Sequence, residues 1–399
     1  MHRTDPSYDV VVVGARAAGA ATALLLARHG LRVLVVDRAR YGADTLSTHA
    51  LMRGGVLQLT RWGLLDRIVA AGTPAVRRTT FRYAGDVVPI DLKPSYGVEA
   101  LYAPRRTVLD PVLVDAAVAA GADVRFGVAV TGVRRDRHGT VTGITGRTRD
   151  GESLRVLARV VVGADGIRST VAEAVGAPFD RVGRSAAAAT YGYWSGLETD
   201  GYEWSWRPDA ASGVIPTNDG QACVFASASP RRIGRGGMEA FTGIVAESSG
   251  DLATRLAAAV PPAAFRTFTG HPGYLRRSWG RGWALVGDAG YFKDPLSAHG
   301  LTDALRDAEL LARAIVAVVR DGADERDALA GYQATRDDLS AALFDVMDVI
   351  AGHRWTDGEI PDLLLELSAA MGDELVALAA LPPVPAGPPL PEPAYSGCG

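Results

Sequence analysis

The residues best placed to do chemistry begin with a glycine-containing loop near the start of the chain. Four valines at 10–13 lead into this loop, and a helix is expected directly after it. The candidate phosphate contacts are Gly14, Arg16, Ala17, Ala18 and Gly19. A dinucleotide pyrophosphate binds at such a helix start because free backbone N–H groups and the helix dipole attract anions. Gly14 would allow the tight turn and Gly19 the close packing of helix on strand, while Arg16 replaces the usual middle glycine.

An acidic residue follows at the spacing that a dinucleotide requires. Asp37 comes 18 residues after Gly19, at the end of a second apolar run, and Arg38 lies next to it. A carboxylate at this point accepts hydrogen bonds from the adenosine ribose. The pattern therefore predicts a dinucleotide site, and the alternative is an ordinary turn between strand and helix without a ligand.

Two further pairs of an acid and a glycine follow apolar runs. Asp165-Gly166 comes after 160–163, and Gly287-Asp288 comes after 284–286. The second pair leads to a loop and a helix start whose candidate contacts are Pro295, Ala298, His299, Gly300 and Leu301. Carboxylates at the carboxyl ends of parallel strands lie where ligands bind in open α/β sheets. Asp288 would suit the ribityl hydroxyls of a flavin, and the positive helix start would stabilise the anionic pyrimidine edge of its reduced form.

These three motifs, in their order and spacing, resemble the para-hydroxybenzoate hydroxylase-like (class A) FAD-dependent monooxygenases. Relatives of that family include flavin halogenases and geranylgeranyl reductases, and the resemblance covers about residues 8–350. It implies that the glycine loop and Asp37 hold the ADP half of FAD, and that Gly287-Asp288 holds the ribityl chain. It also implies that Asp165 serves FAD and a transient NAD(P)H, and that Arg106 contacts FAD.

Two histidines are candidates for acid–base or hydrogen-bonding roles because histidine titrates near neutral pH. His299 stands where family hydroxylases commonly carry a flavin-facing Gln, in the run Pro295 to Gly300. His49 falls in a loop that lies near the flavin in relatives. The alternative for each is a histidine that positions the flavin or packs in the core.

An aromatic segment supplies the candidate substrate pocket, consisting of Tyr193, Trp204 and Trp206. A Trp-x-Trp pair on a strand places both rings on one face. These rings would line the pocket or pack in a core. Halogenases carry Trp-x-Trp-x-Ile-Pro and an essential Lys, but here Ile215-Pro216 comes much later and Lys93 lacks the halogenase surroundings. Tyr202 to Trp206 is similar to the Tyr-x-Trp-x-Phe-Pro of geranylgeranyl reductases.

The elements that must position these residues predict an α/β protein. A strand at 8–13, a helix at 17–29 and a strand at 31–36 form one βαβ unit. We expect a Rossmann-like FAD-binding domain of three ββα layers with an inserted, mainly antiparallel β domain for the substrate and C-terminal helices. The expected boundaries are 1–77, 100–180 and 271–330 for the FAD-binding domain, 78–99 and 181–270 for the β domain, 331–380 for the helices, and 381–399 for a Pro/Gly-rich tail.

Composition limits the classes of function. The chain has 399 residues, of which 48% are hydrophobic, and a formal net charge of −3, which favours neither nucleic acid nor an anionic membrane as partner. Two cysteines indicate a reducing compartment, and no signal peptide or membrane span is evident, so we expect a cytoplasmic monomer or homodimer. The seven histidines show no metal-ligand spacing, so no metal is expected.

The leading hypothesis is a single-component FAD-dependent monooxygenase of secondary metabolism. NAD(P)H would reduce FAD, and a flavin C4a-hydroperoxide formed with O₂ would hydroxylate or oxidise an aromatic or polyketide-like small molecule. The alternatives are a flavin reductase or dehydrogenase acting on isoprenoid double bonds, and a halogenase. A non-catalytic carrier, as in the GDP-dissociation inhibitors of similar fold, is disfavoured by the two acid–glycine pairs.

Overall fold

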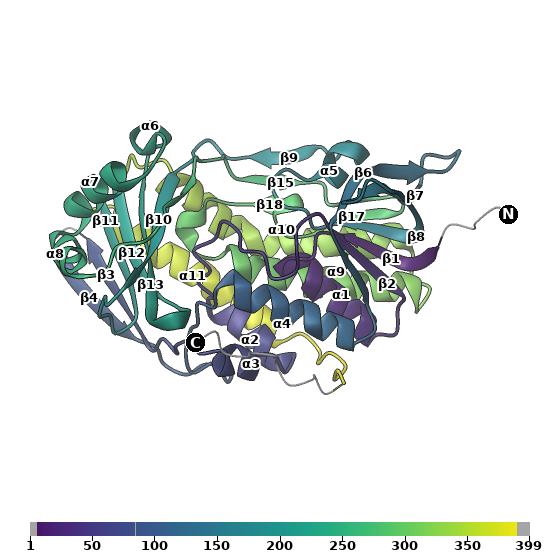
Figure 1. The fold of residues 1–399 in the computed structure, drawn as a ribbon, viewed down its shortest axis with the longest axis horizontal. Coiled ribbons are helices and arrows are strands. Elements are labelled where there is room, and N and C mark those ends of the chain that lie inside the picture. Colours follow the sequence, from purple (N-terminus) through teal and green to yellow (C-terminus); the bar gives the residue numbers. More distant parts are fainter. Residues whose placement is uncertain (1–5, 84, 389–399) are drawn as a thin grey trace.

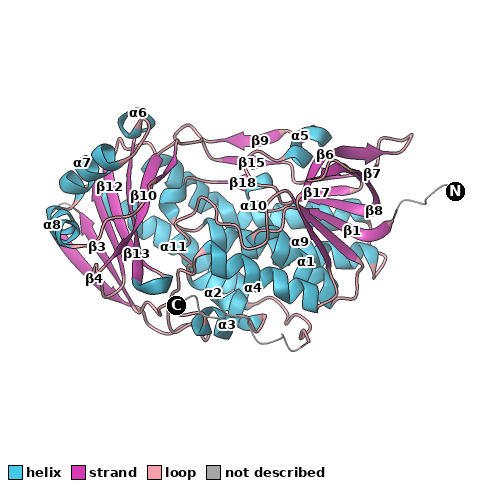
Figure 2. Ribbon diagram, in the orientation of Figure 1, coloured by secondary structure: helices cyan, strands magenta, loops and turns pink. Residues whose placement is uncertain are grey.

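The protein is elongated, with one β-sheet towards each end and helices between them (Figures 1 and 2). The computed structural model describes residues 6–83 and 85–388. Among these residues, strands form an eight-stranded, a seven-stranded and a small three-stranded sheet. None of the described helices is both long enough and apolar enough to cross a membrane.

The eight-stranded sheet brings the three sequence motifs to one edge. Its central order is β16-β17-β8-β1-β2-β5, and β7 pairs with β6 and with β8. The strands are β1 (Ser7–Val13), β2 (Val33–Asp37), β5 (Asp123–Phe126), β6 (Val128–Arg135), β7 (Val141–Thr148), β8 (Ser153–Gly163), β16 (Trp279–Gly280) and β17 (Trp283–Leu285). In the parallel register, Val13 is opposite both Val36 and Gly163, and Gly163 is opposite Leu285. The loops after β1, β2, β8 and β17 therefore leave the sheet side by side.

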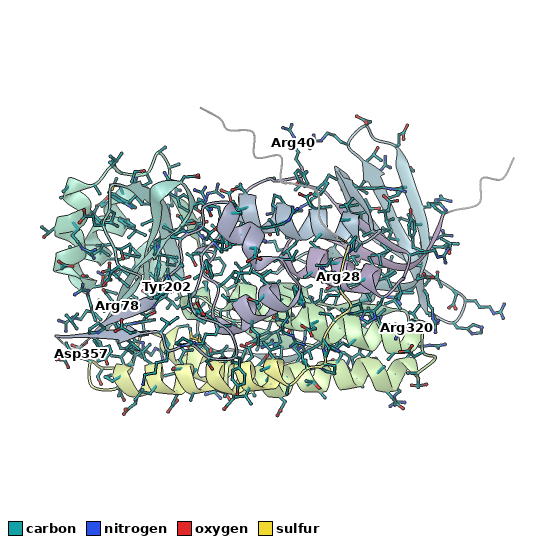
Figure 3. The ribbon with its side chains drawn as sticks, turned by 90° about the horizontal axis from the view of Figure 1, so that it is seen from below. Arg28, Arg40, Arg78, Tyr202, Arg320 and Asp357 are labelled. Carbon is teal, nitrogen blue, oxygen red and sulfur yellow. The ribbon has the colours of Figure 1, made fainter. Side chains whose placement is uncertain are left out.

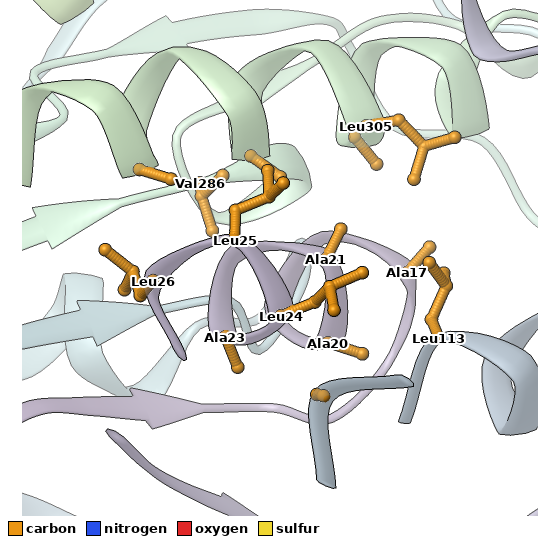
Figure 4. Packing of buried hydrophobic residues seen from close by; sticks show 14 of the residues in the cluster. Ala17, Ala20, Ala21, Ala23, Leu24, Leu25, Leu26, Leu113, Val286 and Leu305 are labelled. Carbon is orange, nitrogen blue, oxygen red and sulfur yellow. The ribbon is translucent and has the colours of Figure 1, made fainter. Parts of the chain in front are cut away.

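Helices on one face and strands on the other give this region the expected three layers. Helices α1 (Ala17–Arg28), α4 (Arg106–Ala119) and α9 (Gly300–Val319) pack together on one face, and β6, β7 and α5 (Thr170–Val175) lie on the other. The alanines of α1 allow this close packing. In Figure 4, Leu25 points towards Val286 and Ala17 towards Leu113. The α/β fold class predicted from the sequence is confirmed.

The seven-stranded sheet has the order β14-β10-β13-β12-β11-β3-β4 and is antiparallel except for the pair β11 and β3. Its strands are β3 (Arg78–Tyr83), β4 (Asp86–Asp91), β10 (Ala188–Ser195), β11 (Tyr202–Arg207), β12 (Ala210–Pro216), β13 (Gln221–Ala228) and β14 (Arg266–Phe268). Strands β3 and β4 form an antiparallel hairpin at one edge of this sheet.

One part of the insertion differs from the expectation of short strands throughout. Residues 230–258 form helices α6 (Pro230–Ile233), α7 (Met238–Ser248) and α8 (Gly250–Ala258). Phe241, Ile244 and Val245 recur at helical spacing, and they pack on the face of the sheet that carries Val214 and Val224. The spacing of these apolar residues is therefore that of a helix that packs on a sheet.

The remaining elements join the two ends. Strands β9 (Phe179–Val182), β15 (Tyr274–Arg276) and β18 (Tyr291–Phe292) form the small sheet, and helices α2 (Arg53–Arg61) and α3 (Leu65–Ala70) lie near α4. Three short 3₁₀ turns are η1 (Asn218–Gly220), η2 (Gly287–Ala289) and η3 (Pro295–Ser297). Helices α10 (Glu325–Ile350) and α11 (Ile360–Ala379) follow α9, and Figure 3 shows the C-terminal helices as one layer along an edge of the molecule.

The domain boundaries proposed above stay a prediction, because α11 packs against both α2 and α10. Of the expected tail, residues 382–388 form neither helix nor strand, and 389–399 lie outside the described residues.

Candidate functional site

A cavity of about 530 Å³ extends from the edge of the eight-stranded sheet to the seven-stranded sheet. Asp37, at the end of β2, lines one part, and Tyr191 of β10 and Phe268 of β14 line another. The predicted residues on its wall are Gly14, Arg16, Ala17, Ala18, Asp37, Arg38, His49, Arg106, Asp165, Asp288, Pro295, Ala298, Gly300 and Leu301. Gly19, Gly287, His299, Tyr193, Trp204 and Trp206 are not among the wall residues.

The glycine loop presents the start of α1 to this cavity. Gly14 has φ +106°, and a Cβ there would lie 2.4 Å from the carbonyl oxygen of Ala164. A Cβ at Gly19 would lie 1.9 Å from the carbonyl oxygen of Gly14, so Gly19 acts through packing. Within the described residues no side chain caps the first turn of α1. Its free N–H groups therefore suit an anionic ligand.

Arg16 is tied to the neighbouring helix rather than free in the cavity. Its Nη1 donates to the Ala43 carbonyl oxygen at 3.3 Å and lies 3.4 Å from Oδ2 of Asp110. Arg106, at the start of α4, donates from Nε and Nη2 to the two carboxylate oxygens of Asp110, both at 3.0 Å. Burial raises the pKa of Asp110, and Arg106 and Arg16 oppose that shift. Both arginines thus share one buried carboxylate and line the wall beside the glycine loop.

Asp37 is held rigidly by the backbone on both sides. Its carboxylate oxygens accept hydrogen bonds from the N–H groups of Ala15 and Ala39, each at 2.7 Å. The side chain is buried but lines the cavity, so its remaining lone pairs face the space where a ribose would lie.

Asp165 is largely occupied within its own loop. It accepts hydrogen bonds from the Ser169 hydroxyl and from the N–H of Thr170 at 2.7 Å, and so fixes the start of α5. Burial raises its pKa, and the bond from Ser169 opposes this. Asp165 therefore shapes the wall, and its direct contact with a cofactor stays a prediction.

Asp288 is the carboxylate most open to the cavity. Its exposed surface faces the cavity, and protein surrounds it on the other sides. The loss of water around the carboxylate raises the pKa of Asp288 to about 6, against the opposing effects of Lys293 and Arg106. At Gly287, φ is +59° and a Cβ would lie 2.9 Å from that of Ala18, so α1 fits closely over this turn.

His49 is buried at the wall in the left-handed region, with φ +49°. Its Nε2 lies 3.1 Å from the Tyr193 hydroxyl, and the two rings stack at 5.7 Å between centroids. The Arg105 guanidinium lies 3.6 Å from the centre of the Tyr193 ring. Burial, together with the charges of Arg105 and Arg106, lowers the pKa of His49 to about 3. His49 is therefore neutral near pH 7 and suits a hydrogen-bonding role better than that of a proton donor.

His299 faces away from the cavity. It is buried, and its Nε2 pairs with Glu374 of α11. Burial lowers the pKa of His299, and Glu374 opposes the shift. The structure thus separates the two histidines that the sequence proposed as catalytic.

Lys293 is a wall residue that sequence reasoning did not select. It follows Gly287-Asp288 in the same loop, and it is one of only two lysines in the chain. Its position five residues after Asp288 was the available signal. Its side chain is buried against the cavity, and its Nζ pairs with Asp303, which is also on the wall.

One group of side chains has ligand atoms close enough for a metal ion. Ligand atoms of His299, Asp303 and Glu374 lie within 4.8 Å of one another. Lys293 and Arg306 already contact the two carboxylates, with Arg306 Nη1 2.8 Å from Oε1 of Glu374.

The two tryptophans proposed for the substrate pocket are placed in the core instead. Trp204 and Trp206 lie on β11 and point to the same side, as expected for alternate strand positions. Trp204 packs on Tyr202 and Phe225, and Trp206 on Trp355, with 6.3 Å between ring centroids. Tyr193 is connected to the cavity through His49.

The wall as a whole fits FAD. Uncapped N–H groups and arginines suit a pyrophosphate, Asp37 a ribose, and Asp288 a polyol, and these groups follow one another along one cavity.

Comparisons with known proteins agree with this assignment. The model of a family described as FAD binding domain matches residues 7–346. Aklavinone 12-hydroxylase DnrF of Streptomyces peucetius is 28% identical over 91% of this chain and 78% of its own length. Digeranylgeranylglycerophospholipid reductase of Methanocella arvoryzae is 27% identical over 82% of both chains. The flavin-dependent brominase Bmp2 shares the fold, with a TM-score of 0.79 at 20% identity over 94% of this chain and 93% of its own.

Proposed function

Since the chain belongs to the FAD binding domain family, the class A flavoprotein monooxygenases, we propose that this FAD-dependent oxidoreductase hydroxylates or oxidises an aromatic or polyketide-like small molecule. NAD(P)H is the reductant in this proposal and O₂ the source of the added oxygen.

The observation that carries the proposal is the ring-lined part of the cavity. His49, Tyr191, Phe268, Tyr291 and Phe292 all line it, in a region reached from the FAD-binding edge. Flat apolar walls favour a flat ring system by stacking and burial of apolar surface. A substrate bound there would lie in the same cavity as the cofactor.

Each part of the wall has a defined task. When bound, FAD supplies the redox chemistry, taking electrons from a nicotinamide and passing them to O₂. The start of α1 and Asp37 hold the nucleotide end, and Asp288 holds the polyol chain. The start of α9 at Gly300 directs its positive end towards the cavity. Neutral His49, held by Tyr193, orients a substrate hydroxyl or carbonyl, and the ring-lined wall excludes water.

A reductase of isoprenoid double bonds is the second candidate, favoured by the similarity to the archaeal reductase over most of both chains. The halogenase alternative is supported only by a shared fold. Lys93, the residue weighed for that chemistry, is exposed and is not among the wall residues.

An oxygen-labelling experiment distinguishes these candidates. The FAD-loaded protein is mixed anaerobically with NADH or NADPH, and flavin bleaching is followed in the presence of a panel of polycyclic phenols and quinones. Admission of ¹⁸O₂ should then place one labelled oxygen in the product, as read by mass spectrometry. A product with two added hydrogens and no label would indicate the reductase, and a halogenated product formed only with halide would indicate the halogenase. Failure of both nicotinamides to bleach the flavin would remove NAD(P)H from the proposal.

A further inference from the structure

A buried group of charged side chains lies directly behind the cavity wall. We call it the ionic network, and it consists of Lys293, His299, Asp303, Arg306, Asp307 and Glu374. Arg306 is its centre, with Nη1 3.1 Å from Asp303 and 2.8 Å from Glu374, and Nη2 2.7 Å from Asp307. Lys293 pairs with Asp303 at one end, and His299 pairs with Glu374 at the other. All six residues are buried.

The network has one end in the cavity and the other on the C-terminal helix. Lys293 and Asp303 are both wall residues, and the Lys293 ammonium lies 5.2 Å from the centre of the Tyr291 ring, also on the wall. Glu374 belongs to α11, beyond residue 346 where the match to the family model ends. This part of the site is therefore built partly by a segment outside the matched region.

Burying such a network has a large desolvation free energy, so it is a poor way to hold helices together. Removing charges from water costs several kcal/mol per ion, so packed apolar side chains often stabilise a fold as well or better. A connection between α9 and α11 alone would not need a lysine in the loop that lines the cavity. We therefore expect the charge of Lys293 to interact with a ligand in the cavity.

Many charged groups act on Lys293. The titratable and charged groups around Lys293 come from four elements and from its own loop. They are Asp288 of η2, Tyr291 of β18, Asp294 next to Lys293 in sequence, His299 before α9, Asp303, Arg306 and Asp307 of α9, and Glu374 of α11. Burial and, next, Arg306 lower the pKa of Lys293 to about 7, against the opposing effects of Glu374, Asp307 and Asp288. The ammonium charge is therefore poised to change near neutral pH.

We propose that the charge of Lys293 acts electrostatically on the FAD bound in this cavity, and that Glu374 of α11 positions Lys293 through Arg306 and Asp303. The ammonium group stabilises the reduced, anionic cofactor relative to the oxidised, neutral one, because a fixed charge in a water-poor cavity interacts strongly with developing charge. Arg306 and Asp303 keep the amine at the wall. This proposal depends on FAD in the cavity, and not on the substrate, on NAD(P)H or on O₂.

The test is the midpoint potential of bound FAD, measured against redox dyes with dithionite between pH 5.5 and 9. At a potential where the wild-type flavin is half reduced at pH 6, Lys293→Met should lower the ratio of reduced to oxidised FAD by about tenfold or more, the effect expected of one nearby charge at an effective dielectric constant of about 20. Lys293→Arg should keep the wild-type ratio at pH 6.

The pH dependence separates a role towards FAD from a purely structural one. Reduction of the wild-type flavin should take up an extra proton above about pH 7, because the anion favours the Lys293 ammonium, so its potential should fall more steeply there. This extra slope should be absent in Lys293→Arg, whose charge is permanent. In Glu374→Gln it should begin at lower pH, because Glu374 raises the pKa of Lys293.

Glu366→Gln is the matched control, since it makes the same chemical change at an exposed position of the same helix. It should leave both the potential and its pH dependence unchanged. Wild-type potentials and slopes in Lys293→Met and Lys293→Arg would overturn the proposal. If Lys293→Met does not retain FAD, identical pH dependence in wild type, Lys293→Arg and Glu374→Gln would overturn it as well. Loss of NAD(P)H oxidation with these redox effects intact would instead count only against the proposed reaction.

Discussion

The two halves of the cavity are built in different ways. The nucleotide half consists of backbone and of carboxylates at strand ends, where the parallel register places Val13 opposite Val36 and Gly163. The substrate half consists of side chains from distant segments, such as His49, which pairs with Tyr193 of β10, and Tyr291. Each part of the first construction is encoded by a short contiguous motif and tolerates little change in backbone shape. The second depends on how whole elements pack.

The largest expected effect is a loss of FAD affinity caused by a change in the backbone of the nucleotide half. Gly19→Ala would place a Cβ about 1.9 Å from the Gly14 carbonyl oxygen, so α1 must move away from the loop. We expect FAD affinity to fall by more than roughly a hundredfold, because a displaced helix start loses its contacts with the pyrophosphate. Fluorescence titration with FAD measures the loss.

Gly243→Ala is the control for that change. Gly243 also lies within a helix, α7, but a Cβ there has no atom within 4 Å. This variant should bind FAD normally and unfold with a free energy higher by about 1 kcal/mol from helix propensity. Equal FAD affinity in the two variants would show that the close contact at Gly19 does not shape the site.

A smaller effect is expected where the wall depends on a buried ion pair. Arg106→Met leaves buried Asp110 with Arg16, at 3.4 Å, as its remaining ion-pair partner, and removal of one member of a buried pair costs about 3–5 kcal/mol of unfolding free energy. Arg207→Met removes the half-exposed pair with Asp357 at the other end of the molecule, which should cost about 1 kcal/mol or less. Urea unfolding of both FAD-free variants measures the difference. Similar losses of unfolding free energy in the two variants would contradict the view that the FAD-binding wall depends on its buried ion pair.

The smallest expected effect concerns the substrate half and is seen through pH. The folded-state pKa of His49 is about 3, below its usual value, so the unfolded chain binds a proton that the folded chain does not between about pH 6.5 and 3. Stability from this residue is present above pH 6.5 and is lost as pH falls through that window, by at most about 1.4 kcal/mol per pH unit. His49→Gln should remove this contribution to the slope and leave FAD affinity unchanged. His138→Gln, at an exposed position, should leave the wild-type slope. A wild-type slope in His49→Gln would mean that His49 takes up protons freely in the folded protein.

The sequence was sufficient for the nucleotide half because its signals are contiguous. Each apolar run that leads to Gly14, Asp37 or Asp288 predicts both a strand and the functional group at its end, and the order of these runs predicts the α/β fold. The α7 helix was missed although the spacing of Phe241, Ile244 and Val245 indicates a helix.

The substrate half was largely beyond sequence reasoning. Nothing near Glu374 in the chain indicates that it contacts His299, and the rotation of His299 away from the cavity follows from that pairing. Trp204 and Trp206 were equally compatible with a pocket and a core until the position of Trp355 was known. Lys293 was visible as a rare lysine, but its access to the cavity depends on the fold of the loop that carries it.

The central claim is that this cavity holds FAD, and direct binding tests it most plainly. The purified chain, freed of ligand by partial unfolding and then refolded, is dialysed against an excess of FAD and its visible spectrum is recorded. We predict a yellow protein that retains one FAD per chain, and a Gly19→Ala variant that stays colourless. A wild-type protein that takes up no FAD under these conditions would contradict the account.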